Sequence, residues 1–103
     1  MESFDLYKYI FYALDDQYDQ NPNEELGNFL SGMNPFLFEG EGSAVPEVYE
    51  SFKQMFETKY TIITSVKESY DFAKEYIASL NIKSVTEAFD KVTFEAWSDV
   101  VKF

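Results

Sequence analysis

Apolar residues along the first twenty positions recur at the three- and four-residue spacing of an amphipathic helix. Two stripes run side by side, one of Phe4, Tyr7, Phe11, Leu14 and Tyr18 and one of Leu6, Ile10 and Ala13. The pattern predicts a helix from about Phe4 to Gln17 with Ser3 as its N-cap. Because the two stripes together make a wide apolar arc, we expect this helix to pack against more than one neighbour.

Polar residues between positions 15 and 23 predict a loop, and a second helix follows it. Asn21, Pro22 and Glu24 have the spacing of an N-cap, a first helical proline and a capping-box acid. Glycine at position 32 and the Asn34-Pro35 pair predict the end of this helix.

Residues 34–45 contain two glycines and a proline, which predicts an irregular loop. Three large apolar residues, Phe36, Leu37 and Phe38, follow one another inside it. We expect them to fold back onto the core, because three exposed apolar side chains would form an adhesive patch.

From Pro46 onward the sequence predicts four more helix starts. They are predicted at Pro46, at the capping boxes Ser65-x-x-Glu68 and Ser84-x-x-Glu87, and at Thr93. Residues 60–64 have strand-like composition but no second strand to pair with, so they predict an extended linker, with a short strand as the alternative. We expect Trp97, in the last helix, to be buried. The sequence therefore predicts an all-α fold, with residues 1–103 forming a single compact bundle of five to six short helices and an irregular loop near 34–45.

The residue types that are absent exclude several kinds of chemistry. The 103 residues include no His, Cys or Arg. Without them the chain cannot build a Ser-His-Asp or Cys-His site, a thiolate metal centre, a disulfide or an arginine clamp on phosphate. We therefore expect no cofactor and no catalytic activity. A carboxylate-dependent enzyme remains an alternative, since Glu47 and Glu50 would share one helix face.

Charge is the strongest functional signal in the sequence. The formal net charge is −11, which opposes binding to nucleic acid or to anionic membranes. Residues 1–52 hold 11 carboxylates and one lysine, a net charge of −10, whereas residues 53–103 hold 8 carboxylates and 7 lysines. The first residues lack a basic region followed by an apolar run, and no apolar run is long enough to span a bilayer, so we expect a cytoplasmic protein.

Tyrosines lie beside the carboxylates of the first half, and this combination suits a basic protein partner. Carboxylates steer a basic protein toward the surface, and tyrosine rings supply the buried anchors. The predicted partner-binding residues are Asp5, Tyr9, Tyr12, Asp15, Asp16, Tyr18, Asp19, Glu24 and Glu25, extended by residues 39–50. In composition the chain resembles small acidic inhibitors, immunity proteins and adaptors, which have no catalytic residues, and this resemblance implies a protein-binding role.

A divalent-cation site is the second alternative. Helix, acidic loop and helix together resemble an EF-hand, and Asp19, Asn21 and Asn23 match loop positions 1, 3 and 5. Position 6 is Glu24 where glycine is needed, and position 12 is Leu30 where the bidentate glutamate belongs. A looser site for Ca²⁺ or Mg²⁺ from Asp15, Asp16 and Asp19 stays open as a hypothesis, and a thermal shift with either cation would test it.

Overall fold

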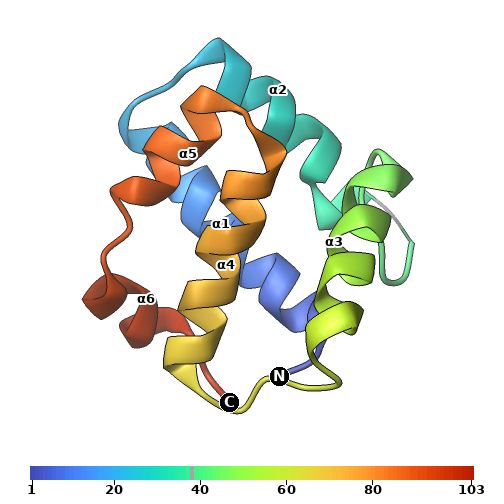
Figure 1. The fold of residues 1–103 in the computed structure, drawn as a ribbon. Helices are drawn as coiled ribbons and strands as arrows, with labels where there is room; N and C mark the ends of the chain where they lie inside the picture. Colours follow the sequence, from blue (N-terminus) through green and yellow to red (C-terminus); the bar gives the residue numbers. More distant parts are fainter. Residues whose placement is uncertain (38) are drawn as a thin grey trace.

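The computed structural model describes residues 1–37 and 39–103, and in these ranges it contains helices but no strand (Figure 1). The elements are α1 (Ser3–Gln20), α2 (Glu24–Met33), the 3₁₀ turn η1 (Pro35–Leu37), α3 (Pro46–Lys59), α4 (Val66–Leu80), α5 (Lys83–Asp90) and α6 (Phe94–Val100). The prediction of an all-α fold of five to six short helices is confirmed, since the described residues form six α-helices and one 3₁₀ turn.

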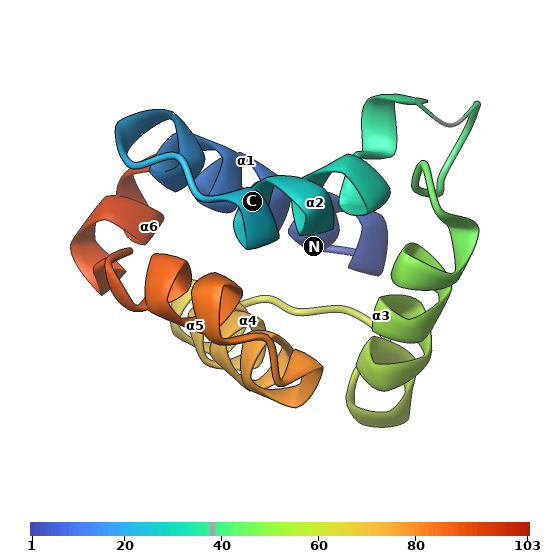
Figure 2. The same cartoon turned by 90° about the horizontal axis from the view of Figure 1, so that it is seen from above.

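The helices form two layers (Figure 2). Helices α1 and α2 lie over α4 and α5, while α3 and α6 lie at opposite ends. Helix α1 contacts α2, α3, α4 and α5, as its wide apolar arc predicts. The two chain ends lie at the same end of the molecule in Figure 1. There the amino group of Met1 donates a hydrogen bond to the carbonyl oxygen of Ile63 at 2.7 Å.

Aromatic rings from different helices form much of the core. Phe52 of α3 is fully buried, and its ring centroid lies 4.8 Å from that of Tyr76 in α4 and 5.3 Å from that of Tyr7 in α1. These pairs adopt the edge-to-face and tilted geometries that the aromatic quadrupole favours. Trp97 is also fully buried, as expected, with its ring 5.8 Å from Phe89. Burial of these rings fixes α6 and α3 at the two ends of the bundle.

Helix α1 is longer than the sequence predicts, and the expected loop at residues 15–23 is wrong over its first six positions. Helix α1 runs to Gln20, whose side chain donates a hydrogen bond to Asp16 across one turn at 3.0 Å. The cap prediction at Ser3 is also wrong. Glu2 is the N-cap, and the Ser3 hydroxyl instead lies 3.0 Å from the Tyr49 hydroxyl in a hydrogen bond.

Side-chain caps fix three helix starts. Asn23, rather than Asn21, caps α2, because its Oδ1 accepts a hydrogen bond from the Leu26 N–H at 3.0 Å. Ser65 and Thr93 cap α4 and α6 as predicted. The predicted capping box at Ser84 is wrong, since the N-cap of α5 is Ile82, two residues earlier, and Ser84 lies inside the helix.

Residues 60–64 link α3 to α4 and form neither helix nor strand, with a bend at Thr61. Ile63 is the fully buried residue of this linker and joins it to the core.

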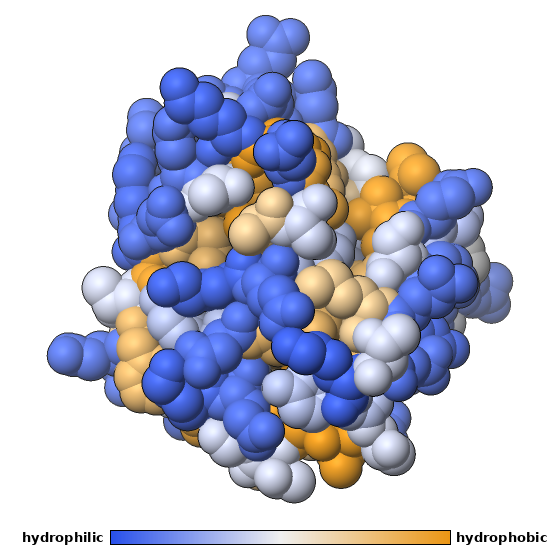
Figure 3. Space-filling model, viewed as in Figure 1, coloured by the Kyte–Doolittle hydropathy of each residue, from blue (hydrophilic) through white to orange (hydrophobic). Residues whose placement is uncertain are grey.

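None of the helices in the described ranges combines the length and the hydrophobicity that a membrane span needs. On the face over α4, hydrophilic side chains separate small hydrophobic patches (Figure 3).

Candidate functional site

Helix α1 divides the predicted partner-binding residues between two neighbouring faces. Spacings of four and three residues place one set on a single face, namely Asp5, Tyr9, Tyr12, Asp16 and Asp19. Asp15 and Tyr18 lie on the adjacent face, toward α2. The helical continuation to Gln20 fixes Tyr18 and Asp19 on these faces, because in a loop they would have no fixed spacing. Seven of the nine predicted residues thus lie on two faces of α1, and the other two, Glu24 and Glu25, lie in the first turn of α2.

An exposed aromatic pair lies beside the first face. Tyr12 is 48% exposed, and its ring stacks on that of Phe36 with centroids 5.8 Å apart. Phe36 is 59% exposed and Leu37 is 71% exposed. The expectation that these two residues fold back onto the core is therefore wrong, and Phe38 lies outside the described residues. We call Tyr12, Phe36 and Leu37 the Tyr12–Phe36 patch.

Local hydrogen bonding accounts for the outward position of Phe36. The Asn34 side chain accepts a hydrogen bond from the Phe36 N–H at 2.8 Å, and Pro35 begins a 3₁₀ turn there. This turn holds the Phe36 ring 6.0 Å from Phe11 on the outside of α1. The Asn-Pro pair was the sequence signal for the turn, but it does not specify the direction of the side chain that follows.

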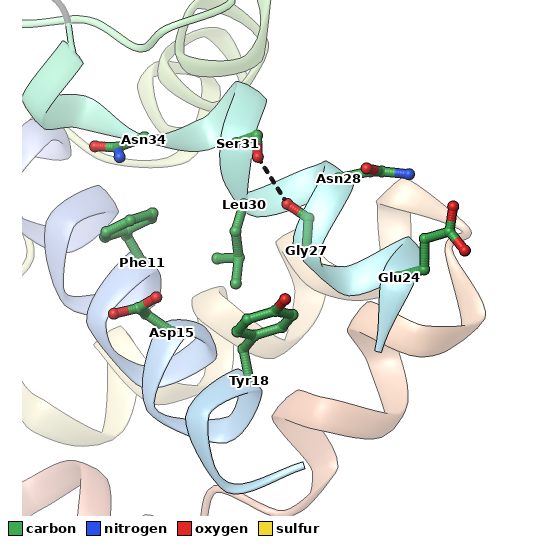
Figure 4. A pocket seen from close by; sticks show the side chains of 9 residues that line it. All are labelled: Phe11, Asp15, Tyr18, Glu24, Gly27, Asn28, Leu30, Ser31 and Asn34. Carbon is green, nitrogen blue, oxygen red and sulfur yellow. Dashed lines mark hydrogen bonds between the residues drawn. The ribbon is translucent and has the colours of Figure 1, made fainter. Parts of the chain in front are cut away.

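A groove of about 390 Å³ lies between α1 and α2 (Figure 4). Phe11, Asp15 and Tyr18 line it from α1, and Leu30 points toward them from α2. Gly27 of α2 allows Tyr18 to lie close to that helix, since a Cβ at position 27 would be only 3.0 Å from Tyr18 Cε2. Sequence reasoning identified Asp15 and Tyr18 but missed Gly27, whose role depends on a contact distant in sequence.

The Asp15 carboxylate is the charged group inside this groove. Partial burial raises its pKa above the ordinary value, and the negative charges of Asp19 and Asp16 raise it further. Among the described residues no lysine forms an ion pair with Asp15. In Figure 4 the carboxylate lies beside the Phe11 ring, one helical turn from Tyr18, and Leu30 points between the two rings. The groove therefore presents a negative charge that has no ion pair among the described residues, on the same helix face as the partly exposed Tyr18 ring.

A second groove, of about 610 Å³, lies between α1 and α6. Tyr9, Tyr12 and Asp16 line it from α1, and Trp97 and Val100 line it from α6. Because Tyr9 is half-buried and its hydroxyl accepts a hydrogen bond from the Lys102 N–H at 3.2 Å, it helps to hold the C-terminal segment. Tyr12 therefore lines this groove and also belongs to the Tyr12–Phe36 patch, so the groove and the patch share its side chain.

Two of the predicted residues, Asp5 and Glu25, have a contact within the protein that leaves them less available to a partner, whereas Glu24 has none among the ion pairs of the described residues. Asp5 lies 3.9 Å from Lys8, so part of its charge is compensated. Glu25 accepts a hydrogen bond from the Ser84 N–H at 3.1 Å. The Ser84 hydroxyl first, and this N–H second, lower the Glu25 pKa. Glu25 therefore connects α2 to the start of α5. Glu24 lines the α1–α2 groove, with its carboxylate pointing outward in Figure 4.

The two alternative chemistries gain no support from the geometry. In the described ranges, no group of three or more carboxylates is arranged to hold a metal ion, and this includes Asp15, Asp16 and Asp19. Glu47 and Glu50 are both exposed on α3 rather than set in a cleft. No protein-family model, curated protein or solved structure matches this chain. What the site can do is therefore argued from its own residues.

Proposed function

We propose that this protein is a non-enzymatic binding domain for a basic protein, which it contacts through the surface of α1. The observation that carries the proposal is the Tyr12–Phe36 patch with carboxylates next to it. Asp15 and Asp16 lie three and four residues after Tyr12, so they flank its ring on the helix. Exposed aromatic side chains with a charged rim are typical of the energetic centre of a protein interface.

The position of the carboxylates gives a second argument. Asp15, Asp16 and Asp19 lie in the last turns of α1, where the helix dipole is negative and where no basic residue is present. Asp19 lies in the last turn, where it repels the dipole. Partial burial raises the pKa of Asp15, and the negative charges of Asp19 and Asp16 raise it further, so the three carboxylates also repel one another. A face that served only solubility would gain more from carboxylates at helix N-termini. Attraction of a basic partner explains why they occupy these unfavourable positions.

Charge reversal tests the electrostatic part of the proposal. The partner is first isolated by affinity capture from the native organism at low and high salt, and its binding rates are then measured by surface plasmon resonance. Changing Asp15, Asp16 and Asp19 to Lys should slow association by at least about tenfold, because steering acts mainly on the association rate. The matched control reverses three exposed carboxylates at other helix C-termini, Glu57, Asp90 and Asp99. Equal slowing of association in the two triple variants would mean that net charge, and not the position of these carboxylates, causes the effect.

Alanine substitution tests the aromatic part. Tyr12→Ala and Phe36→Ala should each speed dissociation and weaken binding by about 2 kcal/mol, or roughly thirtyfold, if these rings are the anchors. Phe94→Ala is the control, since Phe94 is also an exposed ring in edge contact with a tyrosine, Tyr70. Affinity that is unchanged by Tyr12→Ala, by Phe36→Ala and by salt would contradict the proposed surface.

A further inference from the structure

The α1–α2 groove opens beside the Tyr12–Phe36 patch, and Phe11 joins the two features. The Phe11 ring lies 6.0 Å from Phe36 in the patch and also lines the groove. A protein seated on the patch would therefore place its neighbouring side chains over the groove entrance. The nine lining residues include two carboxylates, Asp15 and Glu24, and no lysine. The groove is thus next to the uncharged patch, and its charged lining residues are all negative.

The groove has the parts that recognise a guanidinium group. Asp15 supplies a carboxylate that the described residues leave without an ion pair. Phe11 and Tyr18 lie about one turn before and one turn after Asp15 on α1, and Leu30 of α2 points between their rings (Figure 4). Phe11 is buried, so the partly exposed Tyr18 ring is the one that a ligand could stack on. A planar guanidinium both stacks on aromatic faces and donates paired hydrogen bonds to a carboxylate, whereas a lysine ammonium is a strongly hydrated point charge.

We propose that the α1–α2 groove is the pocket into which the basic partner inserts an arginine side chain, with Asp15 binding the guanidinium and Tyr18 stacking on it. This inference rests on the proposed function, and it adds the chemical identity of the group that is recognised. Gly27 positions the stacking wall, since any larger residue there would displace the Tyr18 ring from α2. The rise in the Asp15 pKa is consistent with such a role, because a bound cation would stabilise the ionised carboxylate.

The test uses small probes rather than the partner. The isotopically labelled protein is titrated with N-acetyl-arginine methylamide, and amide shifts are followed by NMR. The lysine and citrulline counterparts are titrated in parallel, and citrulline is the neutral analogue of arginine. We expect saturable shifts that centre on residues 11, 15, 18, 27 and 30, weaker ones with lysine, and none with citrulline. Shifts spread evenly over the acidic surface would overturn the proposal, and so would equal binding of lysine and arginine.

Variants separate the groove from general charge attraction. Asp15→Asn should weaken arginine binding by about tenfold or more, while Asp16→Asn, one position away and facing α6, should change it less than about twofold. Tyr18→Leu should weaken binding, whereas Tyr18→Phe should keep it because the ring remains. Equal losses in Asp15→Asn and Asp16→Asn, or full binding by Tyr18→Leu, would overturn the proposal.

The two proposals fail in different ways. If arginine does not bind in the groove but Tyr12→Ala still weakens partner binding, the groove inference is wrong and the proposed function stands. If arginine binds in the groove but the captured partner is indifferent to Tyr12, Phe36 and salt, the groove stands and the proposed function is wrong.

Discussion

Two buried tyrosines, Tyr7 and Tyr76, differ in a single hydrogen bond. The Tyr7 hydroxyl donates to the carbonyl oxygen of Met33 at 2.7 Å, which ties α1 to the end of α2. The Tyr76 hydroxyl is buried, and among the described residues it has no hydrogen-bond partner. Burial raises the pKa of both phenols, so both stay neutral near pH 7. A comparison of the two side chains therefore measures how much an unsatisfied buried hydroxyl lowers the free energy of unfolding.

Removing these hydroxyls should have opposite effects on stability. Tyr76→Phe should raise the free energy of unfolding by about 1 kcal/mol, because it deletes a buried polar group that lacks a partner. Tyr7→Phe should lower it by about 1–3 kcal/mol, because the Met33 carbonyl loses its donor. Urea denaturation of both variants and of wild type checks the signs. A destabilising Tyr76→Phe change would mean that its hydroxyl does have a partner.

Asp15 gives a second residue-scale prediction, in the pH dependence of stability. Its pKa in the folded state is raised, so ionisation of Asp15 disfavours the fold. The penalty is absent below the unfolded pKa of about 3.9 and is complete once the pH exceeds the folded pKa. Asp15→Asn should therefore raise the melting temperature at pH 7, by no more than about 2–4 °C for an exposed site.

The same gain should disappear as the pH falls below about 3.9, where wild-type Asp15 is itself protonated. Melting curves of wild type, Asp15→Asn and Asp16→Asn between pH 3 and 7 measure the difference. A gain from Asp15→Asn that persists at pH 3 would show that the effect does not come from ionisation.

At the scale of elements, α6 is the shortest helix and depends on one side chain. Trp97 is fully buried, and its Nε1–H donates to the Ser69 hydroxyl of α4 at 3.0 Å. Trp97→Ala should lower the free energy of unfolding by about 3–5 kcal/mol, the usual effect of deleting a large buried aromatic side chain. Ser69→Ala leaves the indole N–H without its acceptor and should lower the free energy of unfolding by about 1–3 kcal/mol. Calorimetry of both variants tests whether α6 belongs to the core.

The elements also show which parts of the fold could be predicted. Helical spacing identified all six helices, and the starts of α3, α4 and α6 were correct because Pro46, Ser65 and Thr93 act locally. The C-terminus of α1 was wrong because polar residues at positions 15–20 have a loop-like composition. Tyr18 packing beside Gly27 of α2 supports these turns, and this contact is not local in sequence.

The candidate site was predictable in composition but not in arrangement. Charge and tyrosine content placed it on residues 5–25, and Tyr12 is indeed exposed there. Phe36 was assigned to the core because local sequence does not say which way a side chain leaves a 3₁₀ turn. Asp15 and Asp16 already lie in the predicted helix, but Tyr18 and Asp19 have fixed places on its two faces only because the helix continues to Gln20. Their geometry depends on tertiary contacts that the spacing of residues does not contain.

At the scale of the whole molecule, dense negative charge opposes folding. The formal net charge of −11 occupies a body with principal extents of 34 × 31 × 22 Å. Two of its ion pairs have short N–O distances. Lys59 Nζ lies 2.7 Å from a Glu75 carboxylate oxygen, Lys67 Nζ lies 2.7 Å from an Asp71 carboxylate oxygen, and both pairs are exposed. Exposed pairs contribute about 0–1 kcal/mol each. Repulsion among the unpaired carboxylates is therefore the larger whole-molecule effect.

This balance predicts that salt stabilises the protein. At 0.01 M ionic strength the Debye length is about 30 Å, close to the longest extent of 34 Å, so nearly all charges repel one another. At 0.15 M it is about 8 Å, shorter than the smallest extent of 22 Å, so only near neighbours interact. The melting temperature at pH 7 should rise between these two sodium chloride concentrations and then level off. The variant with Asp15, Asp16 and Asp19 changed to Lys should melt higher at low salt and show a smaller rise, because it carries less net charge. A melting temperature that falls with salt in both proteins would mean that attractive ion pairs outweigh the repulsion.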